Sequence, residues 1–144
     1  MTEKQKILVQ ESFEKVRPIA EIAADLFYKR LFTIDPSLRS LFRGDHKEQG
    51  RKLMHMLGLA VKGLDNVNQL IPAVEELGRR HGNYGVRDEH YETVGGALLW
   101  TLERGLGEHF TQDVKEAWIA VYEVLALTMQ RGARHGAAAQ SQPA

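Results

Sequence analysis

Apolar side chains recur along this chain at intervals of three and four residues, and that periodicity limits the fold more than any other feature. A stripe in the C-terminal half shares one helix face: Val114, Trp118, Val121, Leu125 and Met129. Similar stripes cover most of the chain, and no segment has the two-residue alternation of a half-buried strand. The sequence therefore predicts an all-α protein with about seven helical segments.

Capping residues and prolines indicate where these helices begin. Thr2 and Gln5 form a capping-box pattern for a helix ending near residue 16, and Pro18 suits the first turn of the next. Asp35 and Pro36 begin a short turn that ends at Phe42, and residues 43–48 read as a polar connection. Further helices are expected over about 49–64, 71–81, 88–106 and from Thr111 onward.

One domain accounts for the whole chain. A length of 144 residues is ordinary for a single domain, and no repeat or change of composition indicates a second. We expect the domain to occupy residues 1–131. Residues 132–144 lack large apolar side chains, so we expect them to form a disordered tail.

Charge and cysteine content remove several functional classes. Nineteen basic residues balance nineteen acidic ones, so neither nucleic acid nor an anionic membrane is favoured as a partner. No apolar run resembles a membrane span or a signal peptide, and we expect a cytoplasmic location. The chain has no cysteine, which excludes disulfides, thiolate zinc sites and iron–sulfur clusters.

His81 is the strongest candidate for a functional residue. It follows Leu70, Ile71, Val74 and Leu77 at spacings of three and four, so its imidazole extends an apolar helix face. Neutral imidazole is the commonest metal ligand in proteins, and a histidine facing an apolar cavity is the usual axial partner of haem iron. A hydrogen-bonded core histidine would fit the same position.

The remaining histidines lack ligand spacing. His46 and His135 fall in polar or tail segments, and His109 falls in a loop. His55 points away from the apolar face of its helix, and His90 lies on an exposed first turn. We therefore expect no second metal site.

Five segments, in this order and spacing, resemble the bacterial single-domain globins. That family includes the Vitreoscilla-type haemoglobins and the haem domain of flavohaemoglobins. The matching segments are 26–32 with Tyr28, 36–42, 49–54, 77–86 with His81, and 90–95. The resemblance runs from about residue 2 to residue 131, and it implies a globin fold whose helices pack around a haem pocket.

The resemblance also implies a cofactor, haem b, held without the thioether bonds that cysteines would form. His81 is the implied iron ligand, and Phe42 is implied to stack on the haem face. The other positions implied to contact haem are Leu53, Val86, Val94, Leu98 and Arg80. Considered alone, the apolar ones fit an ordinary core. Arg80, like its neighbour Arg79, also fits a solvated helix end.

Tyr28 and Gln49 match the family positions whose hydroxyl and amide face the bound gas. Donors there favour dioxygen over carbon monoxide, because dioxygen on ferrous haem becomes partly superoxide-like. A hydrogen bond to such a charged acceptor contributes about 1.5–3 kcal/mol. The alternatives are a core tyrosine bonded to a backbone carbonyl and a solvated glutamine at a helix start.

On the proximal side, Tyr91 matches a tyrosine that shares the hydrogen bonding of the iron ligand with a glutamate of the last helix. The glutamate position falls near Ala133, and neither Ala133 nor Gly132 can serve. This departure argues against a strongly electron-donating ligand and against peroxidase-like reactivity. The sequence does not identify the acceptor that replaces the glutamate.

The resemblance thus implies a cytoplasmic haem globin that binds O2 reversibly at ferrous iron and also takes CO or NO. The alternative function is nitric oxide dioxygenase, which makes nitrate and leaves ferric iron to be re-reduced. The chain ends before a reductase domain could begin, so we expect that activity to need a separate reductase. A cofactor-free interaction module and a gas sensor are further alternatives. Gas affinities and oligomeric state are not determined by the sequence.

Overall fold

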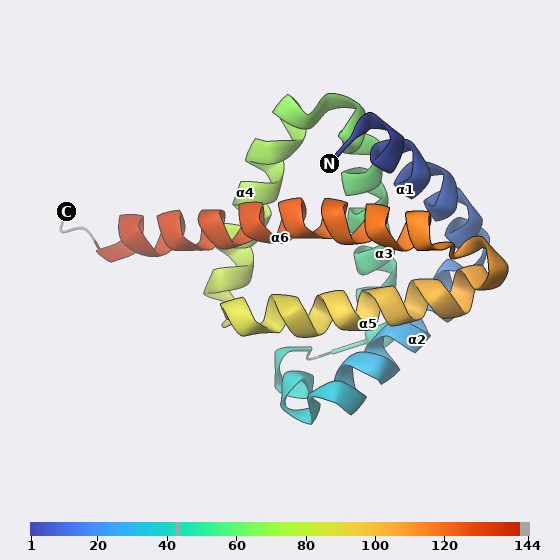
Figure 1. Ribbon diagram of the computed structural model, residues 1–144. Coiled ribbons are helices and arrows are strands. Elements are labelled where there is room, and N and C mark those ends of the chain that lie inside the picture. Colours follow the sequence, from blue (N-terminus) through green and yellow to red (C-terminus); the bar gives the residue numbers. More distant parts are fainter. Residues whose placement is uncertain (43, 142–144) are drawn as a thin grey trace.

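The computed structural model describes residues 1–42 and 44–141, with the backbone alone described for 136–141. Every regular element within them is helical, which confirms the all-α prediction (Figure 1). The α-helices are α1 (Glu3–Val16), α2 (Ala20–Ile34), α3 (His46–Lys62), α4 (Val67–Asn83), α5 (Asp88–Leu106) and α6 (Gln112–Ser141). Short 3-10 turns join them: η1 (Arg17–Ile19), η2 (Pro36–Leu41), η3 (Gly63–Asn66) and η4 (Gly107–His109).

The predicted caps are confirmed at three helix starts. Thr2 and Gln5 form a reciprocal capping box at α1. The Asp35 carboxylate accepts from the backbone N–H of Ser37 at 3.1 Å, and the Thr111 hydroxyl accepts from that of Val114 at 3.2 Å. These side chains satisfy N–H groups that have no partner inside the helix.

Two predicted helix starts are wrong by several residues. Helix α3 begins at His46 and not near residue 49, because the Asp45 carboxylate caps it by accepting from the N–H of Lys47 at 2.9 Å. Helix α4 begins at Val67 and contains Pro72, although proline forfeits a backbone hydrogen bond. Leu70 of that first turn packs against the main core, and this burial offsets the lost bond.

The C-terminal segment also differs from the expectation of a tail. Helix α6 continues to Ser141, and the last part of the expected tail, residues 142–144, lies outside the described residues. Gly132 and Ala133 pack against α4, and Arg134 lies 3.8 Å from the Asp88 carboxylate. These contacts hold the first turn beyond residue 131 against the domain. The domain boundary at 131 itself stays a prediction.

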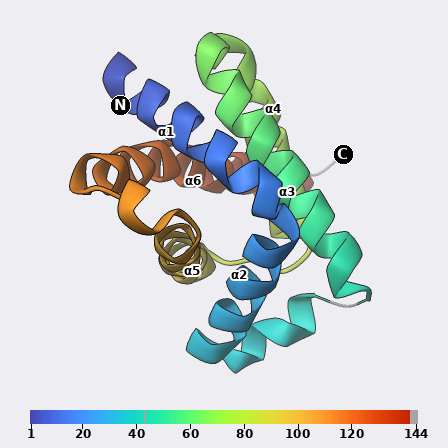
Figure 2. The same ribbon diagram turned by 90° about the vertical axis from the view of Figure 1, so that its right-hand side faces the viewer.

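The main core lies where α1, α3, α5 and α6 meet (Figures 1 and 2). Trp118 of α6 is its largest fully buried side chain, and the ring of Phe13 lies 6.4 Å from it between centroids. The indole N–H donates to the Ser12 hydroxyl at 2.8 Å, and that hydroxyl donates to the Leu8 carbonyl at 2.7 Å. The two polar groups buried in this core are thereby satisfied.

Helix α4 is positioned by α6, which crosses it in Figure 1. The two backbones approach each other at two glycines. A β-carbon on Gly78 would overlap the carbonyl oxygen of Met129, and one on Gly132 would overlap that of Glu75. Only glycine permits this separation, because every other residue would place a side-chain atom inside the partner helix.

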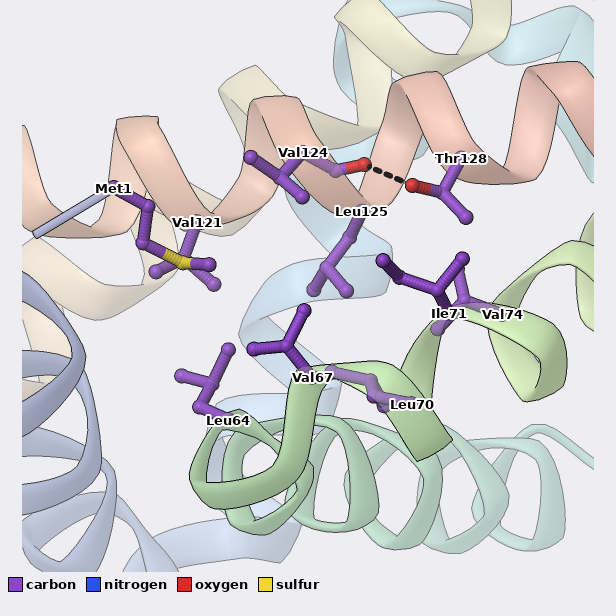
Figure 3. A pocket seen from close by; sticks show the side chains of 10 residues that line it. All are labelled: Met1, Leu64, Val67, Leu70, Ile71, Val74, Val121, Val124, Leu125 and Thr128. Carbon is purple, nitrogen blue, oxygen red and sulfur yellow. Dashed lines mark hydrogen bonds between the residues drawn. The ribbon is translucent and has the colours of Figure 1, made fainter.

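Toward its N-terminus, α4 is less tightly packed on α6. Figure 3 shows a small apolar cavity there, and Met1 also reaches its wall. The polar group in the lining, the Thr128 hydroxyl, donates to the Val124 carbonyl of its own helix at 2.7 Å. The closest contact of α4 with α6 is thus at its C-terminal half, which carries His81. None of the helices in the described part of the chain has the length and apolar character to span a lipid bilayer.

The glycine contact predicts a difference between two helical glycine substitutions. Gly78→Ala should lower the free energy of unfolding by about 3 kcal/mol, because the new methyl group forces α4 and α6 apart. Gly96→Ala in α5 has nothing within 4 Å of the new atom and should raise it by about 0.5–1 kcal/mol through helix propensity. Urea unfolding of both variants tests this, and equal stabilities would refute the close approach.

Candidate functional site

A second apolar cluster, which we call the aromatic cluster, gathers half of the predicted site residues. Its buried members are Phe27, Tyr28, Leu31, Phe32, Leu38 and Ala97, and the half-buried members are Leu41, Phe42, Leu53, Val94 and Leu98. Five predicted site residues therefore meet here from α2, the end of η2, α3 and α5: Tyr28, Phe42, Leu53, Val94 and Leu98. Leu98 also touches the main core, so the two clusters are continuous.

Tyr28 lies in the middle of this cluster, 7% exposed. Ring centroids of Phe27 and Phe42 lie 5.3 Å from its own, both edge-on, and that of Phe32 lies stacked at 6.0 Å. Burial raises the pKa of the Tyr28 hydroxyl to about 12, so the group stays protonated at neutral pH. Among the described residues it has no hydrogen bond to a backbone carbonyl, the alternative considered above. It is a donor surrounded mainly by aromatic rings.

Gln49 lies on the first turn of α3 and is half-buried. Its neighbour Gly50 brings α3 close to α2, because a β-carbon on Gly50 would lie 2.9 Å from that of Ala24 and 3.9 Å from the Tyr28 ring. This close approach places the first turns of α3 next to the part of α2 that carries Tyr28. The role of Gln49 toward a bound gas stays a prediction.

His81 is half-buried near the end of α4, and its Nδ1 lies 2.8 Å from the Leu77 carbonyl oxygen. A carbonyl only accepts, so in the neutral ring Nδ1 carries the proton and Nε2 keeps a free lone pair. This is the tautomer that a metal ligand requires, and such an outer hydrogen bond orients the ring. Leu77 was not predicted as the acceptor. The sequence could have predicted this acceptor, because Leu77 precedes His81 by four residues and so lies one helical turn before the imidazole.

Tyr91 on the first turns of α5 presents a second donor. Burial, and secondarily the charge of Asp88, raise the pKa of its hydroxyl, which is buried without a hydrogen-bond partner among the described residues. The Tyr91 carbonyl accepts from the Tyr122 hydroxyl at 2.6 Å, and this bond ties α5 to α6. A buried donor without an acceptor costs about 1–3 kcal/mol, so an acceptor supplied by a bound group fits here. Its predicted sharing of the His81 hydrogen bond is not tested.

Val86 and Arg80 flank His81 without joining the aromatic cluster. The Val86 N–H donates to the His81 carbonyl at 3.1 Å, which fixes the turn after α4. Arg80 is exposed and has no ion pair with any described residue, whereas Arg79 pairs with Glu76 and lowers the pKa of that carboxyl. The Arg80 guanidinium is therefore available to an anionic group, and its contact with a haem carboxylate stays a prediction.

The candidate iron ligand and the aromatic cluster are carried by different helices. Helix α4 packs on α6, and within the described residues its backbone makes few contacts with α3 or α5, which carry part of the aromatic cluster. His81 thus offers one metal ligand on α4, and Tyr28 offers a donor on α2. No group of three His, Cys, Asp or Glu side chains within described residues could hold a bare metal ion. A porphyrin brings four ring nitrogens of its own, so this donor set fits haem.

Comparison with known proteins decides the family. Residues 25–129 match the family model described as Globin. The chain belongs to the globin family. Relatives of this globin include the flavohemoprotein of Vibrio cholerae, 38% identical over 103 residues, which cover 69% of this chain and 26% of that protein. The neuroglobin of Danio rerio is 30% identical over 146 residues, with 92% of each chain covered.

Solved structures agree with this globin fold. A hexacoordinated haem protein from an anhydrobiotic tardigrade has a TM-score of 0.84 at 19% identity and covers 93% of this chain and 96% of its own. An engineered carbene transferase, built on a Rhodothermus marinus protein provisionally named a nitric oxide dioxygenase, has a TM-score of 0.87 at 24% identity with 99% of both chains covered. Family and relatives together support haem-based gas binding. This globin spans about a quarter of the Vibrio flavohemoprotein.

The His81 geometry predicts the effect of removing its ring. His81→Ala should abolish stable haem retention, because no other described histidine comes with an outer hydrogen bond that frees Nε2 in this pocket. Haem transfer to an apo-globin acceptor, followed by the Soret band, measures retention. Leu77→Ala is the matched control, since it keeps the accepting carbonyl. An unchanged spectrum and transfer rate in His81→Ala would contradict the assignment.

Proposed function

We propose that this globin holds haem b through Nε2 of His81 and binds O2 reversibly at ferrous iron. The observation that carries the proposal is the state of two groups on two different helices, His81 on α4 and Tyr28 on α2. His81 has its proton committed to Leu77 at 2.8 Å, and Tyr28 keeps a protonated hydroxyl with no carbonyl partner among the described residues. The first is suited to bind iron and the second to donate to what the iron holds.

In this proposal the residues of the chain have separate roles in binding haem and the gas. Haem, when bound, supplies a ferrous iron able to take a diatomic gas. Tyr28 donates a hydrogen bond to the gas, with Gln49 as the second donor of this proposal. Phe42, Leu53, Val94 and Leu98 are apolar and exclude water, which keeps the donor's interaction strong. Arg80 is the proposed partner for the charged edge of the porphyrin, and Tyr91 is the proposed neighbour of His81 on the proximal side.

The acceptor on His81 bears on the choice between binding and oxidation. Leu77 supplies a neutral carbonyl, whereas a carboxylate would give the imidazole more negative character. Less electron donation from the ligand disfavours cleavage of the O–O bond. This supports reversible O2 binding, storage or delivery as the principal function. We retain a cytoplasmic location as part of the proposal.

Tyr28→Phe tests this function. Loss of the donor should speed O2 dissociation by about 10- to 100-fold, because a hydrogen bond to a partly charged ligand contributes about 1.5–3 kcal/mol. Carbon monoxide takes up less charge, so its dissociation should barely change. Flash photolysis and stopped-flow mixing measure both rates. Tyr84→Phe is the control, since Tyr84 is 71% exposed. Equal acceleration for the two gases would indicate a change of pocket size instead.

Nitric oxide dioxygenation is the second candidate, favoured by the similarity to flavohemoproteins. In that reaction NO and O2 combine to give nitrate, and one electron leaves the ferrous haem. Each turnover then needs an electron from a separate reductase. The same residues serve it, because Tyr28 and Gln49 would hold the oxygen for attack.

The dioxygenase activity has a direct test. The oxygenated protein is mixed with NO in a stopped-flow instrument, and nitrate and the ferric spectrum are followed. A flavin reductase and NADH are then added, and we expect repeated cycles with one nitrate formed per NO consumed. The same mixture with His81→Ala is the control. A ferric product that the reductase never returns to the ferrous state would exclude the enzyme and leave the carrier.

A further inference from the structure

His46 lies against the ring that carries the proposed donor. Its imidazole stacks on Tyr28 with a centroid distance of 6.2 Å and an interplanar angle of 21°. It also lies 5.9 Å from the ring of Phe32, tilted by 40°. The sequence placed His46 in a polar connection, but it is the first residue of α3, where the Asp45 cap fixes the backbone.

Among the rings around Tyr28, His46 is the most exposed. Phe27 and Phe32 are buried and Phe42 is half-buried, whereas His46 is exposed and lines a surface groove between α2 and α3. His46 is also the only ring of this group that can change charge, since imidazole is the side chain that ordinarily titrates between pH 5 and 8. The Tyr28 phenol thus has three neighbouring rings that are always neutral and one, His46, whose charge can change.

We propose that His46 is a positioning residue for Tyr28. The His46 ring holds the Tyr28 phenol in its donating orientation, and the charge of the imidazole sets the strength of the hydrogen bond that the phenol donates. This inference rests on the proposed gas binding at Tyr28. A cation over an aromatic face draws on the electron density of the ring. The phenol hydroxyl then becomes more acidic and donates a stronger hydrogen bond. In its neutral form the imidazole contributes packing alone.

Other charged groups surround the groove and are the background to this effect. Glu21 and Asp25 face it from α2, and Lys47 and Arg51 face it from α3. Asp45 at the helix start adds a third acidic side chain. On the η2 side, the Arg39 guanidinium lies 5.1 Å from the centroid of Phe32. None of them stacks on Tyr28, so the pH-dependent change comes from His46.

Two substitutions at His46 separate orientation from charge. His46→Phe keeps a ring on Tyr28 but cannot be protonated, and His46→Ala removes the ring. His55→Phe is the matched control, because His55 lies on the same helix, is exposed and has no ring contact or hydrogen bond with described residues. O2 and CO dissociation are measured on the haem-loaded full chain between about pH 5.5 and 8.

We expect O2 to leave wild type about threefold more slowly at the acid end than at the alkaline end. His46→Phe should release O2 at the wild-type alkaline rate without pH dependence. His46→Ala should be about fivefold faster than His46→Phe throughout, because the phenol is no longer held. His55→Phe should match wild type, and CO rates should not follow these changes. A His46→Phe protein that keeps the pH profile would overturn the charge role, and an unchanged His46→Ala rate would overturn the orienting role.

A second measurement distinguishes failure of this inference from failure of the proposed function. If wild type takes up no haem, gas binding is wrong, and the ring contact is then followed in the full chain by NMR of 13C-labelled tyrosine. Tyr28→Phe assigns the signals. Tyr28 ring shifts that titrate in wild type and His55→Phe but not in His46→Phe would support the coupling. Shifts that ignore pH in all three proteins would refute it.

Discussion

The backbone contact between α4 and α6 sets the position of everything on the His81 side. At Gly78 and Gly132 the helices approach without side chains between them, so their separation is determined by main-chain atoms. His81 lies one turn beyond Gly78, and its place relative to the aromatic cluster follows from that contact. The N-terminal half of α4 lies over a small cavity and contributes less to this placement (Figure 3).

The same contact accounts for the missing carboxylate near the imidazole. With Gly132 against Glu75 and Ala133 against Gly82, the α6 backbone occupies the space beside α4. A side chain at residue 132 would overlap the Glu75 carbonyl, and Ala133, near the implied glutamate position, lies against Gly82. The imidazole therefore bonds within its own helix, to Leu77. Close helix packing and a neutral acceptor are two aspects of one arrangement.

The sequence predicted most of the helices, because periodicity and caps are local properties. Tyr28, Phe42, Leu53, Val94 and Leu98 do meet in one cluster. The stacking of His46 on Tyr28 was not predicted, because a polar segment in the sequence does not indicate which distant ring one of its side chains will contact. The extension of α6 beyond residue 131 was missed because small residues look disordered in isolation and become ordered only against a partner helix.

The hydrogen bond from His81 to Leu77 spans a single turn at the end of α4, and helix ends are where a fold opens first. The buried side chains of the core around Trp118 come from other helices, so this core does not depend on that turn. If His81 holds haem, retention of the cofactor and integrity of the domain are governed by separate free energies. On warming, haem would then dissociate at a lower temperature than the one at which the protein unfolds. A folded globin without haem absorbance would be an intermediate of thermal unfolding.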